Sequence, residues 1–153
     1  MRSSEAETLA LRLLARRDFT RAELNQKLRA RNFSSDLVAE ICDSLVEKGF
    51  LDDQRVATRL LSTALEADDM GSARLAQLLH KRKLSRSMVE ETMANFHAHV
   101  DEVERATALA ERFINAGLQR AAIERRLWQR GMPAHAVRAA VANVNLDKED
   151  EEG

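Results

Sequence analysis

The sequence has few of the residues that form disulfides, aromatic cores or membrane spans. Its 153 residues include one cysteine, one proline and 4% aromatic residues. A single cysteine cannot form an intrachain disulfide. No apolar run approaches the roughly 18 residues of a membrane helix, so no membrane span is expected. The N-terminus also lacks the basic patch and apolar run of a secretory signal, and we therefore expect a cytoplasmic protein.

The residues that are present are typical of a helical protein. Hydrophobic residues make up 44% of the chain and charged residues 32%. Residues that favour strands do not alternate with polar residues over any useful length. We therefore predict an all-α fold. The cysteine, Cys42, lies beside Ile41 in an apolar helical stripe, and we expect a buried structural thiol rather than a reactive one.

One apolar skeleton occurs three times along the chain. Its members are separated by four, five and five residues, and successive sets begin 51 and 48 residues apart. The three sets are Leu24, Leu28, Phe33 and Val38; Leu75, Leu79, Leu84 and Val89; and Ile123, Leu127, Met132 and Val137. A period of this length is typical of tandem repeats, in which neighbouring units supply much of the stability. We predict three tandem three-helix repeats at residues 1–49, 50–99 and 100–146, forming an elongated, curved helical array.

Local signals indicate where the helices start. Thr20 and Glu23 have the spacing of a capping box, and Phe19 and Leu24 that of a hydrophobic staple. The pair at 52–53 resembles helix-end carboxylates that cap a helix. The predicted helices span about 4–17, 20–31, 34–48, 52–68, 71–82, 85–99, 101–116, 119–130 and 133–145.

Glycines indicate where helices stop. Four follow an apolar-periodic run and suit the left-handed residue just past a helix. They are Gly49, Gly71, Gly117 and Gly131. Asn32 occupies the equivalent place after the second helix. Lys83 is its counterpart in the middle repeat, and because lysine is a poor left-handed residue, we expect a turn that is strained or built differently.

Charge is unevenly distributed along the chain. Residues 147–152 carry five acids and one lysine, a balance of −4, whereas the whole chain carries −1, so residues 1–146 carry +3. We expect a mildly basic folded body and a disordered acidic tail at 147–153.

The second helix of each repeat is the most basic element. An arginine lies seven positions after the first skeleton residue in all three repeats, and further cations surround it. The candidate residues for binding a partner or nucleic acid are Lys27, Arg29, Arg31, Lys81, Arg82, Lys83, Arg125, Arg126 and Arg130. Two interpretations are open. The cations favour the C-terminal end of a helix dipole, or the repeats align them as a stripe for phosphates or acidic protein.

The only tryptophan, Trp128, occupies the position held by Arg29 and His80 in the other repeats. A tryptophan there either anchors a partner or packs against a neighbouring helix. We favour packing.

No catalytic or metal-binding constellation is visible in the sequence. His97 and His99 would lie on different sides of a helix, and no cysteine or carboxylate completes a zinc-like spacing. Phosphate-binding glycine loops and nucleophile elbows are missing. We predict that the protein is not an enzyme and uses no metal or cofactor.

Three segments resemble a known family. The runs LLARRDFTRAELNQKLRARNF, LVEKGFLDDQRVATRLL and GSARLAQLLHKRKLS are similar to the RecX family, whose members modulate the RecA recombinase. The similarity extends from about Leu9 through the third repeat. This sequence departs from the family pattern at Val56, Leu60 and Leu61, where aromatic residues are usual, and at Lys83, where glycine is usual.

The resemblance implies three tandem three-helix units and a regulatory role. It implies that the protein binds the RecA filament along its groove and inhibits filament growth, ATP hydrolysis and strand exchange. It also implies non-specific contacts with the phosphates of single- or double-stranded DNA. A monomer is the simplest expectation. The family supplies no catalytic residues, so the basic stripe remains the candidate site.

Two other functions stay open on the residues alone. One is a helix-turn-helix-like DNA-binding protein, although the third helices, which would read bases, are acidic or neutral. The other is a helical-repeat scaffold for another protein, because basic edges also suit acidic peptides.

Overall fold

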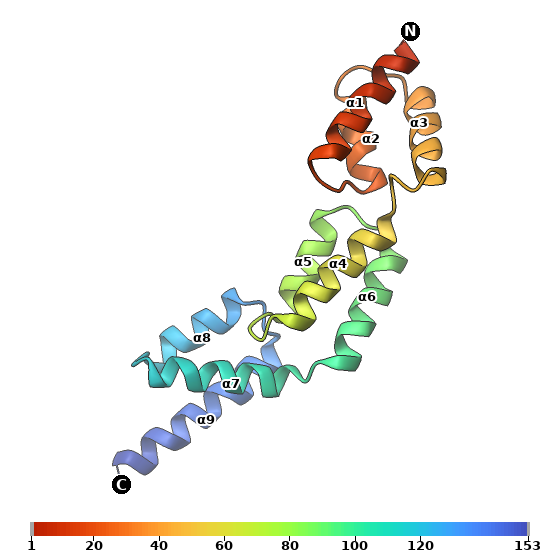
Figure 1. Ribbon diagram of the computed structural model, residues 1–153. Helices are drawn as coiled ribbons and strands as arrows, with labels where there is room; N and C mark the ends of the chain where they lie inside the picture. Colours follow the sequence, from red (N-terminus) through yellow and green to blue (C-terminus); the bar gives the residue numbers. More distant parts are fainter. Residues whose placement is uncertain (1, 153) are drawn as a thin grey trace. The chain divides into compact units, whose positions relative to one another are not determined.

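The computed structural model describes the backbone of residues 2–152 and the side chains of residues 2–142 and 144. This part of the chain consists of helices joined by short turns, without a strand (Figure 1). The helices are α1 (Arg2–Arg16), α2 (Arg21–Arg29), α3 (Ser35–Glu47), α4 (Asp53–Glu66), α5 (Ser72–Lys81), α6 (Arg86–His99), α7 (Glu102–Asn115), α8 (Arg120–Gln129) and α9 (Ala134–Glu152). The predicted all-α fold is confirmed.

Helix α9 is longer than the sequence indicated. We expected it to end near residue 145, but it continues to Glu152, since no proline or glycine interrupts it after Pro133. Residues 147–152 of the expected acidic tail form its last turns, and their side chains, together with Gly153, lie outside the described residues. None of the described helices is long and apolar enough to cross a membrane.

The start of α2 is built as predicted. The Thr20 hydroxyl accepts a hydrogen bond from the Glu23 amide at 3.2 Å, and the Glu23 carboxylate accepts one from the Thr20 amide at 2.9 Å. Phe19 and Leu24, the residues of the expected staple, are buried in one hydrophobic cluster. The capping box is therefore confirmed, and it satisfies two amides that the first turn of a helix leaves unpaired.

Residues with positive φ follow several of the helices. They are Asn32, Gly49, Lys83, Gly117 and Gly131, with φ between 59° and 88°. Lys83 adopts this left-handed conformation with φ of 59°, so its turn has the same backbone form as those at Asn32 and Gly131. The alternative that this turn is built differently is wrong, and the strain expected of a lysine remains.

Gly71 does not have the predicted role. Its φ is not positive, and it precedes α5 instead of ending α4. A Cβ built on Gly71 would lie 2.2 Å from the carbonyl oxygen of Gly131. Glycine is needed here because two backbone segments meet, which a run of residues in sequence does not reveal.

We expect Lys83→Gly to raise the free energy of unfolding by about 1 kcal/mol, because glycine adopts positive φ without the clash of a Cβ. Urea unfolding followed by circular dichroism measures the change. Asn32→Gly is the matched control and should gain less, since asparagine tolerates this conformation. A loss of stability in Lys83→Gly would contradict the expected strain.

The chain forms two compact units. The N-terminal unit comprises Met1–Arg59 and Leu79–Val89, and the C-terminal unit comprises Leu60–Leu78 and Glu90–Gly153. A core of buried residues lies among α1, α2 and α3 in the first unit, and another among α7, α8 and α9 in the second. All skeleton residues are buried except Phe33, which is partly buried. The predicted division into repeats at 50 and 100 stays a prediction.

Cys42 belongs to the core of the N-terminal unit. Its side chain is fully buried, so the expected structural thiol is confirmed. Burial raises the pKa of the Cys42 thiol, and the nearby charge of Arg21 opposes this shift only in part. The thiol therefore stays protonated at neutral pH, and a thiol reagent reaches it only when the unit opens.

Candidate partner-binding surface

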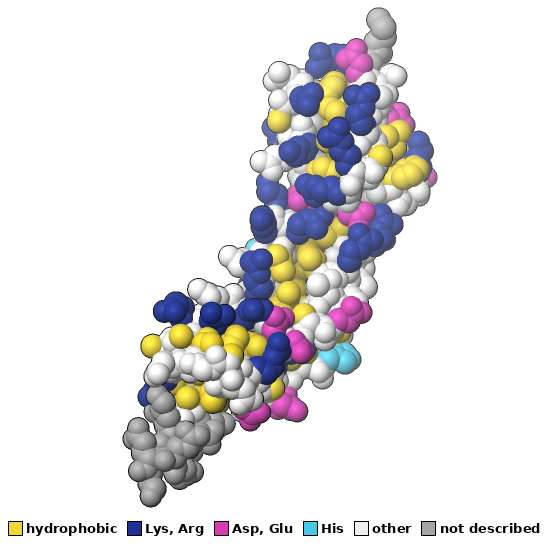
Figure 2. All heavy atoms as spheres, turned by 60° about the vertical axis from the view of Figure 1, so that its left-hand side comes forward, with side chains coloured by type: hydrophobic (Ala, Val, Ile, Leu, Met, Phe, Trp, Pro, Cys, Tyr) yellow, Lys and Arg dark blue, Asp and Glu magenta, His cyan; other side chains and the backbone are white. Residues whose placement is uncertain are grey.

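The predicted binding residues are distributed over both units. In the N-terminal unit six of them lie on or just after α2 and at the end of α5, and in the C-terminal unit three lie on or just after α8. All are exposed except Arg82, whose side chain is 25% accessible. Figure 2 shows that Lys and Arg side chains cover much of the visible face of the N-terminal unit, and that a second group lies on the C-terminal unit.

Arg82 holds the end of α5 to the turn before α2. Its Nε donates to both carboxylate oxygens of Glu23 at 3.1 and 3.2 Å, and its terminal nitrogen donates to the Asp18 carbonyl at 3.0 Å. The Arg82 carbonyl accepts a hydrogen bond from the buried Thr20 hydroxyl at 2.7 Å. We call these contacts the N-terminal junction. They show that Arg82 stabilises the fold of its unit.

Arg130 has a role in the C-terminal unit that corresponds to that of Arg82 in the N-terminal unit. Its guanidinium is paired with Asp69, and its carbonyl accepts a hydrogen bond from the Gly71 amide at 2.9 Å. The Gly131 carbonyl accepts another from the Ala73 amide at 3.0 Å. These contacts form the C-terminal junction, which ties the end of α8 to the turn before α5.

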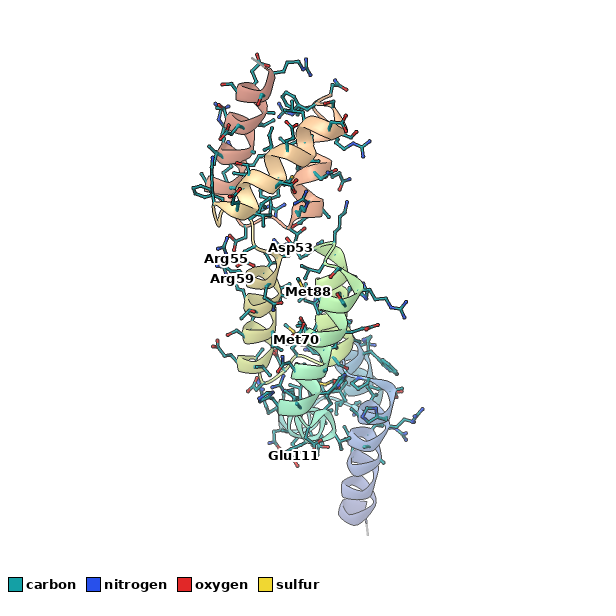
Figure 3. The ribbon with its side chains drawn as sticks, turned by 90° about the vertical axis from the view of Figure 1, so that its right-hand side faces the viewer. Asp53, Arg55, Arg59, Met70, Met88 and Glu111 are labelled. Atoms are coloured by element: carbon teal, nitrogen blue, oxygen red, sulfur yellow. The ribbon has the colours of Figure 1, made fainter. Side chains whose placement is uncertain are left out.

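A carboxylate completes each junction from the first turn of a further helix. Asp53 of α4 accepts a hydrogen bond from the Arg21 amide at 2.8 Å, and Glu102 of α7 accepts one from the Ser72 amide at 2.7 Å. Figure 3 shows Asp53 at the start of α4, with Arg55 and Arg59 following it along the helix. The sequence predicted that the pair at 52–53 caps a helix N-terminus. Asp52 does so by accepting from the Arg55 amide in α4, whereas Asp53 accepts from the Arg21 amide at the start of α2.

The junction residues recur with the repeat, which is the signal that could have identified them. Asp18 and Asp69 are 51 residues apart, although Asp18 contributes its backbone carbonyl and Asp69 its carboxylate. Arg82 and Arg130 are 48 residues apart. The third member of the aspartate series is Gly117. The first member of the arginine series is Arg31.

Two further predicted residues make contacts of their own. Lys83 donates a hydrogen bond to the Gln26 side chain. The Arg126 guanidinium lies over the Phe113 ring, 5.6 Å from its centroid. Both side chains remain exposed, and exposed contacts of this kind contribute little to stability.

The side chains of the other five predicted residues have no hydrogen bond or ion pair to the described part of the chain. They are Lys27, Arg29, Arg31, Lys81 and Arg125. An exposed cation without an internal partner keeps all its donors for a phosphate or a carboxylate. The structure therefore divides the predicted residues into cations that stabilise the fold and cations that are free to bind.

Trp128 is more exposed than we expected. Half of its surface is accessible, whereas Ile123 and Leu127 of the same helix are fully buried. Packing against a neighbouring helix, the interpretation that we favoured, leaves this exposed half unexplained.

The histidines serve local roles. The His97 ring lies 3.4 Å from the buried carboxylate of Glu102, and His99 lies 2.8 Å from the Asn95 carbonyl. No group of three or more metal-ligating side chains occurs among the residues that the structure describes.

Known proteins are similar to this chain in sequence. The family model described as RecX, first three-helix domain, matches residues 6–45. A regulatory protein RecX of Halorhodospira halophila is 36% identical over 99% of this chain and 94% of its own length. Another, of Trichlorobacter lovleyi, is 34% identical over 81% of this chain and 80% of its own.

Solved structures are similar in fold. The crystal structure of RecX from Lactobacillus salivarius matches 94% of this chain and 97% of its own with a TM-score of 0.74 at 21% identity. A second crystal structure, of a regulatory protein RecX, matches 89% of this chain and 71% of its own with a TM-score of 0.68 at 18% identity. At these identities the likeness shows the fold alone.

Proposed function

Since the chain belongs to the RecX family of regulatory proteins, we propose that it binds the RecA nucleoprotein filament and inhibits filament growth, ATP hydrolysis and strand exchange without catalysing a reaction. The observation that supports this most is the set of exposed cations on and beside the second helices whose side chains have no partner among the described residues. The protein would act in the cytoplasm as a monomer.

Such a filament offers the two kinds of group that these cations bind. Its protein presents carboxylates and its DNA presents phosphates, and the planar guanidinium of arginine can donate two parallel hydrogen bonds to either. Lys27, Arg29 and Arg31 lie within five residues of one another at the end of α2 and supply three positive charges. Exposed charges of this kind, at the edge of an interface, act chiefly on the rate of association and on its dependence on salt.

The alternative of a sequence-specific DNA-binding protein is less well supported. The acidic residues of α3, Asp36, Glu40, Asp43 and Glu47, are all exposed. Carboxylates along a helix would be repelled by the phosphates that flank a DNA groove. Non-specific DNA binding and a scaffold role stay as alternatives, and DNA binding with strong salt dependence but no sequence preference would support the first of them.

The test is RecA ATP hydrolysis on single-stranded DNA, with this protein titrated at amounts well below RecA. We expect inhibition at these low ratios. No inhibition, together with tight binding to free DNA, would overturn the proposal in favour of DNA binding.

A pair of charge reversals locates the surface. We expect Lys27→Glu with Arg31→Glu to raise the concentration for half-inhibition about tenfold or more, because like charges then face the acidic partner. Arg12→Glu with Arg16→Glu is the matched control, since both residues are exposed on α1 and the change in net charge is equal. The control should change inhibition by at most about twofold, as screening limits distant charges. Equal losses in both variants would mean that net charge, and not the α2 surface, matters.

A further inference from the structure

We propose that the exposed ring of Trp128 is a stacking site for an unpaired base of single-stranded DNA. The choice of DNA rests on the proposed function, in which the filament carries a single strand. The site is distinct from phosphate binding by the cations of α2, because it uses the face of an aromatic ring and requires a base.

The ring is presented on the outer side of α8. Because Ile123 and Leu127 are fully buried, the opposite side of the helix faces solvent, and Trp128 with Arg125 lies toward that side. Residues three and four apart are neighbours on a helix surface, so the positions of Arg125 and Glu124 both adjoin that of Trp128. Ala121, seven positions before Trp128, is also exposed and too small to cover it.

The backbone that carries the ring is held in place. The end of α8 is fixed by the C-terminal junction, in which Arg130 is paired with Asp69 and its carbonyl accepts from the Gly71 amide at 2.9 Å. The Trp128 carbonyl accepts a hydrogen bond from the Gly131 amide at 3.0 Å. A ring on a fixed backbone loses little conformational freedom on binding, which favours affinity.

The surroundings favour a nucleic acid over a protein as the occupant. A protein interface normally has an apolar centre, but Trp128 is the only exposed large hydrophobic side chain of α8 in the described part of the chain. The helix that carries it is cationic instead: α8 has Arg120, Arg125 and Arg126 against one acid, Glu124. An aromatic ring within a cationic surface is the combination that binds single strands, where the ring stacks on a base and the cations contact phosphates.

The other repeats have planar side chains at the same position. Arg29 and His80 correspond to Trp128 by their place in the skeleton, and both are exposed. Guanidinium and imidazole groups stack on bases as indole does. Bases in a duplex are already stacked on each other, so these side chains select a single strand.

The test uses the intrinsic fluorescence of Trp128, the only tryptophan of the chain. The full-length protein, without RecA, is titrated with a thymidine oligomer and with an abasic oligomer that has the same number of phosphates. We expect the thymidine oligomer to quench the fluorescence and to bind more tightly. Equal quenching and equal affinity for the abasic oligomer would overturn the proposal.

Substitutions complete the test. Because these variants lack the only tryptophan, binding is followed by the fluorescence anisotropy of a dye-labelled thymidine oligomer. We expect Trp128→Ala to weaken binding of this oligomer about tenfold and Trp128→Phe to retain most of the affinity. Phe50→Ala is the matched control, since Phe50 is 52% exposed and lies in the N-terminal unit, and its affinity should not change. Circular dichroism checks that each variant is folded. Wild-type affinity of Trp128→Ala for the thymidine oligomer would overturn the proposal. If that variant also lost RecA inhibition, the ring would contact protein instead of a base. Because RecA is absent, failure here leaves the ATP hydrolysis test of the proposed function untouched.

Discussion

Gly131→Ala is expected to lower the free energy of unfolding of the C-terminal unit by about 4 kcal/mol. About 1–2 kcal/mol of this comes from an L-residue at φ of 80°, and the rest from overpacking. A Cβ on Gly131 would lie 2.3 Å from both the Cβ and the amide nitrogen of Arg74. The backbone of α5 cannot move away without breaking the hydrogen bond from the Ala73 amide to the Gly131 carbonyl. Urea unfolding followed by Trp128 fluorescence measures the loss.

Gly117→Ala separates the two contributions. Gly117 has φ of 88°, but nothing lies within 4 Å of a Cβ built there. This variant should therefore lose only the conformational part, about 1–2 kcal/mol. If the two variants lost equal stability, the close approach of Gly131 to α5 would have no energetic consequence.

Glu23→Ala is expected to cost the N-terminal unit about 3 kcal/mol. The Glu23 side chain is only 13% accessible, and it accepts hydrogen bonds from the Thr20 amide and from Arg82. Its removal breaks the capping box, worth about 1 kcal/mol, and hydrogen bonds to a charged group, worth roughly 1.5–3 kcal/mol. The rate at which a thiol reagent labels Cys42 reports the opening of this unit and should rise about a hundredfold.

Two controls accompany this variant. Glu23→Gln retains the hydrogen-bonding group of a capping box and should cost less than Glu23→Ala. Asp68→Ala removes a carboxylate that is 83% accessible and 3.5 Å from Arg112, and should cost less than about 0.5 kcal/mol. Combining Glu23→Ala with Arg82→Ala should cost less than the sum of the single losses. Additive losses would show that Glu23 and Arg82 do not stabilise the unit together.

Local sequence was sufficient for the helices and their starts. The capping box of Thr20 and Glu23 depends on residues three positions apart, and the buried skeleton depends on helical periodicity. The role of Gly71 was predicted wrongly because it depends on a contact with a segment far away in the sequence. A glycine after an apolar run looks the same in sequence whether it ends a helix or permits a close approach, and the segment that approaches it is 60 residues away.

The candidate site was only partly predictable. Arg31, Arg82 and Arg130 are equivalent in sequence, yet Arg82 is held by groups 59 and 64 residues away and Arg130 by a carboxylate 61 residues away. No rule of spacing within one helix distinguishes these paired arginines from a free one. The exposure of Trp128 could not be predicted from the sequence either, because it depends on what the neighbouring helices leave uncovered.

The two junctions also bear on how a chain of this kind can change its length. The middle repeat alone carries both halves of a junction, Arg82 toward the repeat before it and Asp69 toward the repeat after it. Duplication of that segment in the gene would insert a copy that finds the required partner on each side. Growth by duplication of the middle repeat is thus compatible with both junctions.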